Sequence, residues 1–406
     1  MSMLNRIRKS TECVRRNIWH RFMASDFVMY DYVGLNDEII LPTPKECQEN
    51  IPNALAWWTP IENGAFFNGV YLIGKCDSYL HQPDETLKDE ISKLVLGLYK
   101  LQDVCNTPGV IARGIGSDGS CHYPASSNDQ NIPWILGLWR YLATDIPTPT
   151  QRQECSQRLI RHIRAIQGAS WIFPGETPEF NRGSLLYDEG LEGSLSSVHF
   201  AIITRILAEL VPDEIQLHYN ILNEKLSNGR TRLDIIAAGH NEFKHWHGWF
   251  TATSQYAVQQ LLHYEENESI REKYLQRLRF TAHTAAETIK QYKLYALGQE
   301  RQFTPDWRIM LQDWAPQSTS NQAAEVAMKE VKIWNNACPA IKEDKNTMMA
   351  SLTAAWIVMM SMDDKLIEEN LPDIINAISH FDYDNIFYAA MFYAENLGSQ
   401  VIRYIQ

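Results

Sequence analysis

Two kinds of helical segment alternate along this chain, and this alternation constrains the fold more than any other feature. Helical hydrophobic periodicity runs through most of the 406 residues, whereas strand patterns and hairpin turns are few. Segments with charges on one face are expected at 3–22, 84–104, 149–167, 213–227, 268–297 and 363–380. Segments rich in Gly, Ala, Phe, Met and Trp, nearly without Lys and Arg, are expected at 63–81, 129–143, 192–211, 250–264, 346–361 and 383–397.

A helix that is apolar nearly all round must be covered on every side, so the second kind is expected to form an inner ring inside the first. Joints after inner helices are short, such as "HQP" and "TDIPT". Joints before them are long, at 23–62, 105–128, 168–191, 228–249 and 298–345, with one further helix expected at 321–336. Long loops in compact domains are usually functional. We therefore predict an all-α fold, a single (α/α)6 toroid over residues 1–406 built from six helical hairpins, whose long loops form one mouth.

Charge and composition exclude several classes of protein. A formal net charge of -12 argues against a nucleic-acid partner or an anionic membrane surface. No apolar run reaches the roughly 18 residues that a membrane span needs. The first residues lack the apolar core of a secretory signal, so a cytoplasmic location is expected, or a periplasmic one if a leader has been removed. The seven cysteines form no Cys-x-x-Cys pair, which disfavours a disulfide scaffold or a zinc ribbon.

The loops at the expected mouth carry carboxylates. Asp129 begins the inner helix in "NDQNIPWILGLW", where amide donors of the helix amino end would orient its side chain. The alternative is an ordinary helix N-cap, a role that Asp often takes. Cleavage of a glycosidic bond needs two facing carboxylates. We therefore take Asp129, Glu62 and Asp188 as the candidate catalytic residues.

Aromatic side chains are abundant in the same loops, with 12 Trp, 18 Tyr and 14 Phe in the chain. Flat apolar rings beside polar partners suit the faces of sugars, although core packing and loop anchoring are the plainer explanation. The candidate substrate-binding residues are Trp58, Asn68, Arg113, His122, Tyr123, Gln130, His240, Trp246, His247, Trp249 and Trp307.

The segment "HNEFKHWHGW" offers a possible metal site through His240, Glu242, His245 and His247. It lacks a His-Glu-x-x-His pattern, so sugar contact, proton transfer or structural hydrogen bonding is preferred. No metal is therefore predicted. No cofactor is predicted either, because "GIGSDG" follows no strand and no phosphate-binding loop is present. His199 lies inside an inner helix and is expected to be a core residue.

The chain resembles the six-hairpin glycosidase superfamily, whose members act on oligosaccharides through loops at one end of an (α/α)6 toroid. The nearest local likeness is "NDQNIPWILGLW", which resembles a stretch of unsaturated glucuronyl hydrolases. There an Asp followed by an amide residue opens an inner helix that ends in an aromatic. The resemblance implies that Asp129 is the general acid and base that hydrates an unsaturated sugar, with Gln130 at the amide position.

These features together predict a glycoside hydrolase with an oligosaccharide substrate. An acidic or unsaturated uronic sugar is expected, for which Arg113 would supply the carboxylate partner. One alternative is a polysaccharide lyase or sugar epimerase that uses Tyr123, Tyr187, His240 and His247. A second alternative is a carbohydrate-binding protein without catalysis.

Overall fold

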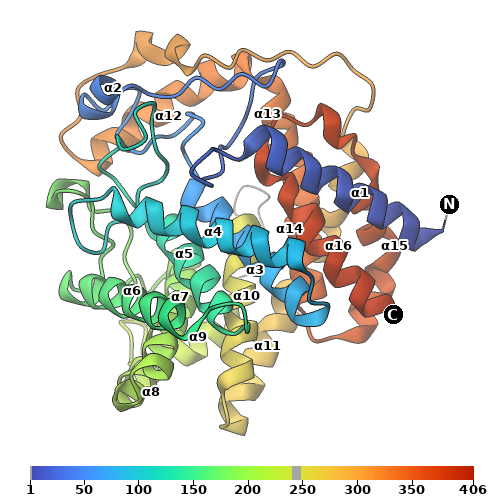
Figure 1. Cartoon of the computed structure of the whole chain (residues 1–406). Coiled ribbons are helices and arrows are strands. Elements are labelled where there is room, and N and C mark those ends of the chain that lie inside the picture. Colours follow the sequence, from blue (N-terminus) through green and yellow to red (C-terminus); the bar gives the residue numbers. More distant parts are fainter. Residues whose placement is uncertain (1, 240–247) are drawn as a thin grey trace.

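The fold is all-α. The computed structural model describes residues 2–239 and 248–406, and helical segments account for 67% of the chain. Within the described ranges no strand forms, and β-pairing is limited to isolated bridges such as Tyr32 with Tyr388. Both chain ends lie on the same side of the molecule, at the right of the view (Figure 1).

The six apolar helices, which the sequence predicts to form the inner ring, contact one another in a cycle that returns to its first helix. They are α3 (Gly64–His81), α5 (Asn128–Leu142), α7 (Gly190–Leu210), α10 (Gly248–Tyr264), α14 (Ala350–Met359) and α16 (Phe392–Ile405). Each contacts the next in this order, and α16 contacts α3 again. Every residue of α14 is buried, as an apolar helix covered on all sides requires.

The amphipathic helices each pack against one helix of this cycle. They are α1 (Met3–Asn17), α4 (Glu85–Asp103), α6 (Pro149–Gly168), α8 (Ile215–Asn223), α11 (Glu268–Ala285) and α15 (Asp364–His380). Their partners are α16, α3, α5, α7, α10 and α14, respectively. Local sequence explains their starts: Asp84 caps α4 by accepting bonds from the amides of Thr86 and Leu87, and Thr148 with Gln151 forms a capping box on α6.

Several helix boundaries differ from the sequence expectation. In the segment 213–227 the α-helix covers only α8, after the 3-10 turn Pro212–Glu214, and 268–297 continues beyond α11 as a 3-10 helix (Ala286–Leu294). The expected helix at 383–397 starts later, because the 3-10 turns Tyr383–Asn385 and Ala389–Met391 precede α16. Turns of π-helix end the first segment (Ile18–Phe22) and precede α14 (Asp344–Met349).

The long loops contain α2 (Pro44–Gln48), α9 (Arg232–Ala238), α12 (Ser320–Ala337), α13 (Pro339–Glu343) and the 3-10 turns Pro178–Phe180 and Trp307–Asp313, and one more 3-10 turn, Pro212–Glu214, lies in the short joint between α7 and α8. Of these, the sequence predicts only α12. The others are too short to show hydrophobic periodicity.

Glycines bring α3 and α5 close together. A Cβ added at Gly69 would lie 2.3 Å from the carbonyl oxygen of Pro133, and one at Gly137 would lie 2.8 Å from the carbonyl oxygen of Gly69. Only glycine permits such an approach of two backbones. The amino ends of the two helices are therefore held together, which places Asn63, the N-cap of α3, beside the first turn of α5.

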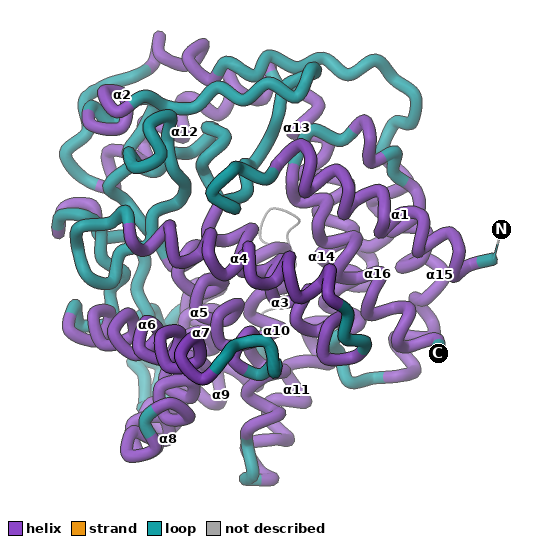
Figure 2. Tube along the Cα trace, viewed as in Figure 1, coloured by secondary structure: helices purple, strands orange, loops and turns teal. Residues whose placement is uncertain are grey.

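Hydrogen bonds join the long loops to one another. The amide of Ala125 donates to Ala54 at 3.4 Å, and the amide of Glu176 donates to Pro124 at 2.8 Å. The indole of Trp314 donates to the carbonyl of Asn50 at 3.1 Å. Figure 2 shows the longest loop segments gathered at the top and left of the molecule. Segments of the loops at 23–62, 105–128, 168–191 and 298–345 therefore contact one another.

The main apolar core draws on the whole length of the chain. One cluster of buried side chains runs from Ile7 in α1 to Val401 in α16. Among the helices of the described ranges, none combines the length and apolar character that crossing a bilayer requires.

Candidate functional site

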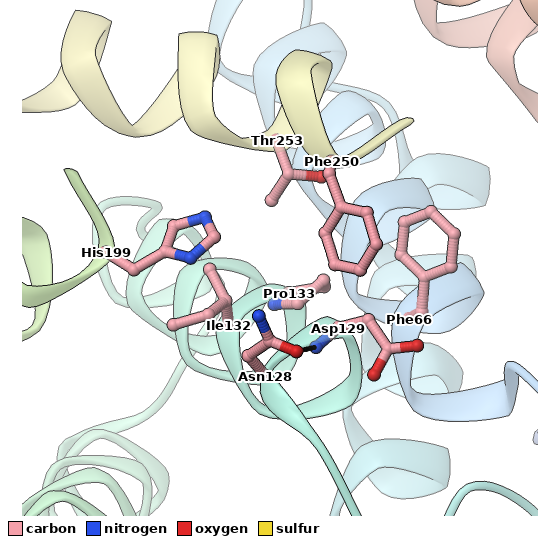
Figure 3. A pocket seen from close by; sticks show the side chains of 8 residues that line it. All are labelled: Phe66, Asn128, Asp129, Ile132, Pro133, His199, Phe250 and Thr253. Atoms are coloured by element: carbon pink, nitrogen blue, oxygen red, sulfur yellow. Dashed lines mark hydrogen bonds between the residues drawn. The ribbon is translucent and has the colours of Figure 1, made fainter. Parts of the chain in front are cut away.

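A small pocket opens at the amino ends of the α3 and α5 pair, where α7 and α10 approach them. Its volume is about 180 Å³, including the open space at its mouth. Its walls are Phe66, Asn128, Asp129, Ile132, Pro133, His199, Phe250 and Thr253 (Figure 3). The carboxylate of Asp129 lies near the rings of Phe66 and Phe250, and the imidazole of His199 lies on the opposite side. A carboxylate, an imidazole and two aromatic rings therefore surround one opening.

Asp129 occupies the first turn of α5 and is only 9% exposed. Both terminal nitrogens of Arg113 face its carboxylate, at 3.5 and 3.4 Å, and the amide of Gln130 donates to it at 3.3 Å. The N-cap of α5 is Ser127, whose hydroxyl accepts a bond from Arg113 at 2.6 Å. Asp129 is therefore not the helix cap, and its carboxylate instead joins the loop before α5 to the first turn of the helix through Arg113.

The polar contacts continue from α5 to the start of α3. The side-chain amide of Gln130 also donates to the Asn63 side chain at 3.3 Å, and Asn63 donates to Asp31 through its backbone and side-chain nitrogens at 2.7 and 2.6 Å. Burial and the negative charge of Glu62 raise the pKa of Asp31 well above its usual value. This chain of bonds fixes the amino ends of both helices relative to Asp129.

Glu62 joins the same network through its backbone. Its carbonyl accepts bonds from Arg113 at 3.2 Å and from Gln130 at 3.4 Å. Its carboxylate instead accepts the backbone N–H of Trp58 at 2.8 Å. The carboxylate of Glu62 therefore binds the backbone of its own loop and not Asp129, and its predicted role as the second catalytic carboxylate gains no support.

A different carboxylate, that of Glu192, lies within electrostatic reach of Asp129. Glu192 is in the first turn of α7 and is exposed to solvent. The pKa of Glu192 is raised mainly because protein atoms around its carboxylate exclude water. The positive charge of Arg182 lowers this pKa, and the negative charge of Asp129 raises it. The sequence does not single out Glu192, because nothing local relates it to Asp129.

Arg182 completes this charged group and was missed entirely. Its guanidinium lies over the ring of Trp57, 5.3 Å from the ring centroid. Burial lowers the pKa of Arg182, and the positive charge of Arg113 lowers it further. Within the described part of the chain it forms no ion pair. The only sequence signal is that Arg182 is the one basic residue in the stretch "GETPEFNRGSLLY".

The structure does not bring Asp188 to the pocket. Its carboxylate accepts a bond from the hydroxyl of Ser227 at 2.7 Å, and this bond lowers the pKa of Asp188. It does not line the pocket. Its contact joins two loops and leaves the predicted catalytic role without structural support.

Two of the predicted substrate-binding residues are buried and bound to the backbone. The side chain of Asn68 accepts the amide of Met29 at 2.8 Å and donates to the carbonyl of Phe27 at 2.7 Å. The hydroxyl of Tyr123 donates to the carbonyl of Ile51. Both side chains have their polar groups occupied and fix loop segments against α3 and α2 rather than facing the pocket.

The predicted sugar-binding tryptophans at 58 and 307 also anchor loops. Trp307 is fully buried, and its indole donates to the carbonyl of Ile40 at 2.8 Å. Trp58 is half-buried, donates to the carbonyl of Ala327 at 2.8 Å, and has the ammonium of Lys345 5.3 Å from its ring centroid. Trp307 therefore packs in the core and anchors its loop, and it is not placed to bind a sugar.

His122 pairs with a carboxylate outside the pocket, that of Glu176, at 2.8 Å. The predicted residues His240, Trp246 and His247, with the metal alternative that included His245, lie outside the described residues. The side chain of Trp249 is likewise not described.

His199 is a core residue, as expected, and its imidazole also lines the pocket. Neither ring nitrogen has a hydrogen-bond partner among the described residues. Burial and the positive charge of Arg277 lower the pKa of His199 to about 3, so the ring is neutral. A neutral, unpaired imidazole in a pocket wall is available to a polar ligand.

Comparison with known proteins adds no further constraint on this site. No family model matches the chain, and neither a curated protein nor a solved structure was found to match it. The chemistry therefore rests on the geometry of Asp129, Glu192, Arg182 and His199.

Proposed function

We propose that this protein is a glycoside hydrolase that acts on an oligosaccharide through Asp129 and Glu192. The observation that carries the proposal is the position of Asp129, a buried carboxylate fixed by Arg113 in a pocket wall, with a second, accessible carboxylate within electrostatic reach. Glycoside cleavage needs two carboxylates in different environments.

The two environments suggest two roles. Glu192 keeps its proton to higher pH than an ordinary glutamate and would donate it to the glycosidic oxygen as the bond to the anomeric carbon breaks. Asp129 would take a proton from the water whose oxygen bonds to that carbon. Arg113 and Gln130 orient the Asp129 carboxylate for this step.

The proposal includes the (α/α)6 toroid over the whole chain. The closed order of contacts from α3 through α5, α7, α10, α14 and α16 supports it, as does the amphipathic helix packed on each of them. In a ring of this kind the amino ends of inner helices and the loops before them surround one mouth, where Asp129 and Glu192 lie in the first turns of α5 and α7.

An acidic sugar is the proposed substrate class, and its carboxylate would bind Arg182 rather than Arg113, the partner expected from the sequence. Arg113 is only 2% exposed and pairs with Asp129, so it is not available. Arg182 lies in the same charged group, over Trp57, and forms no ion pair with the described residues. A guanidinium beside an aromatic face offers one partner for a uronic carboxylate and another for the sugar ring.

The test is incubation of the full chain with a panel of oligosaccharides, including unsaturated uronides, with the products followed by mass. Hydrolysis adds the mass of one water per bond cleaved. Asp129→Asn should lower the rate by at least about 100-fold. Asp188→Asn is the matched control, because it alters a loop carboxylate that binds Ser227, and should keep the wild-type rate.

The same experiment separates the alternatives. Products that absorb ultraviolet light without the added mass of water would show a lyase. Binding of an oligosaccharide without any product, equal in the wild type and in Asp129→Asn, would show a carbohydrate-binding protein. Either result would replace the hydrolase proposal.

A further inference from the structure

Three side chains from separate segments converge outside the pocket. Cys105 follows α4, His122 lies in the loop before α5, and Glu176 lies in the loop after α6. The Cys105 Sγ, one ring nitrogen of His122 and a carboxylate oxygen of Glu176 all lie within 4.8 Å of one another. All three residues are half-buried.

The hydrogen bonds of His122 place a lone pair against the Glu176 carboxylate. The Nδ1 atom of His122 lies 3.1 Å from the carbonyl oxygen of Ser120, which can only accept, so Nδ1 carries the hydrogen. In the neutral ring Nε2 is then an acceptor, yet it lies 2.8 Å from the Glu176 Oε1. Two acceptors at this distance share a proton, and a metal ion that replaces the proton would take the Nε2 lone pair and the carboxylate oxygen as ligands.

Backbone amides fix the carboxylate in this position. The amides of Asn106 and Thr107 donate to the two oxygens of Glu176 at 3.0 and 3.1 Å. The Ser120 carbonyl fixes the imidazole in the same way. Metal-binding histidines and carboxylates commonly have such outer partners, which set the tautomer and the ring orientation.

We propose that Cys105, His122 and Glu176 form a binding site for one zinc ion. Sulfur, imidazole nitrogen and carboxylate oxygen together suit Zn²⁺, whereas Mg²⁺ and Ca²⁺ prefer oxygen alone. Tetrahedral bonds of about 2.0–2.3 Å place ligand atoms about 3.3–3.8 Å apart, so the three atoms are close enough to share one ion, and His122 and Glu176, now 2.8 Å apart, would separate by about 0.5 Å to admit it. A thiolate, a neutral imidazole and a carboxylate would balance the charge of the ion, and a water molecule would complete the four ligands.

The position of the site suggests what the zinc ion would do. It would join the end of α4 to the loops before α5 and after α6, the loops that carry Arg113 and Arg182. The ion would therefore hold the two segments that position the charged groups around Asp129. This inference does not depend on the glycosidase proposal, because zinc binding is measured without a substrate.

The experiment uses the full chain, stripped with a chelator and titrated with zinc sulfate in a calorimeter. One equivalent of zinc should bind and raise the thermal midpoint, because an ion that binds only the folded state stabilises it. Cobalt chloride should then give the intense near-ultraviolet absorption of a thiolate bound to Co²⁺. Cys105→Ser should abolish that absorption, and His122→Gln should weaken zinc binding at least about tenfold.

Cys121→Ser is the matched control. Cys121 is a half-buried thiol in the same loop but has no part in the cluster, so its variant should bind zinc and cobalt as the wild type does. Wild-type protein that binds no zinc, or that binds cobalt without the thiolate absorption, overturns the proposal. In that case a proton occupies the position between His122 and Glu176, and the pair is an ordinary ion pair.

Discussion

Arg113 and Asp129 form a buried ion pair in which both terminal guanidinium nitrogens approach the carboxylate, at 3.5 and 3.4 Å. Arg113 precedes the polar loop, and Asp129 follows it in the first turn of α5. The pair therefore closes the loop over the start of the helix. It also gives the site its orientation, because the Arg113 side chain bonds to the Glu62 carbonyl and the Ser127 hydroxyl as well.

Replacing Arg113 with Met should destabilise the protein strongly. Asp129 is 9% exposed and would remain as an uncompensated buried charge, which typically costs about 3–5 kcal/mol. The free energy of unfolding in urea is the measurement. The double variant Arg113→Met, Asp129→Asn should recover most of the loss, since it removes both charges. If the single and double variants unfold alike, the ion pair is not what stabilises this loop.

The environment of Glu192 predicts a shift in the pH–rate profile. A general acid must carry its proton, so the rate should fall as the pH rises through the pKa of Glu192. Because the protein atoms around the Glu192 carboxylate remove part of its water and so raise that pKa, the fall should come at a higher pH than for an ordinary glutamate. The measurement is kcat/KM against pH on the oligosaccharide substrate that the panel identifies.

Glu192→Gln tests the assignment directly. It should remove the alkaline limb and reduce the rate far more for a sugar leaving group than for an aryl glycoside, whose leaving oxygen needs no proton. An unchanged alkaline limb in this variant would assign the titration to another group.

The close approach of α3 and α5 predicts a severe effect of one methyl group. Gly69→Ala would place a Cβ 2.3 Å from the carbonyl oxygen of Pro133, a backbone atom that cannot rotate away. Overpacking of this kind costs about 1–3 kcal/mol or more, and the thermal midpoint should fall accordingly. Gly168→Ala is the control, because that glycine ends α6 with no atom within 4 Å of an added Cβ. Equal midpoints for the two variants would mean that the helices separate without cost.

The sequence predicts those parts of the fold that depend on local periodicity. The apolar and the amphipathic helices follow from hydrophobic spacing, whereas Arg113, expected to bind a sugar carboxylate, pairs with Asp129 instead. Helix ends were less certain. The segment 383–397 has the apolar character of an inner helix, yet its first residues form 3-10 turns, because Phe387 donates its amide to the buried Asp344 instead of to a helical carbonyl.

Contacts between distant segments could not be predicted. Glu192 and Asp129 lie in the first turns of different helices, and no spacing rule relates them. Cys105 and His122 lie at the two ends of the loop between α4 and α5, and Glu176 lies in the loop after α6, so no local motif relates the three side chains. Trp307 looked like a ligand-facing indole because burial in a loop is invisible to periodicity.

Closure of the helix cycle depends on Lys75, and its replacement with Met should destabilise the protein. Lys75 of α3 is 2% exposed, lies 2.6 Å from a carboxylate oxygen of Glu90 in α4, and also pairs with Glu395 in α16. Without the ammonium Glu90 still pairs with Arg15, but the buried Glu395 retains only the hydroxyl of Tyr71, and the expected loss is about 3–5 kcal/mol in the free energy of unfolding. Lys365→Met is the control, because the pair of Lys365 with Glu369 is 3.8 Å long and exposed, and its loss should cost less than about 1 kcal/mol. Urea unfolding of both variants gives the comparison, and a similar small loss in each would show that α3 and α16 are held together by apolar packing alone.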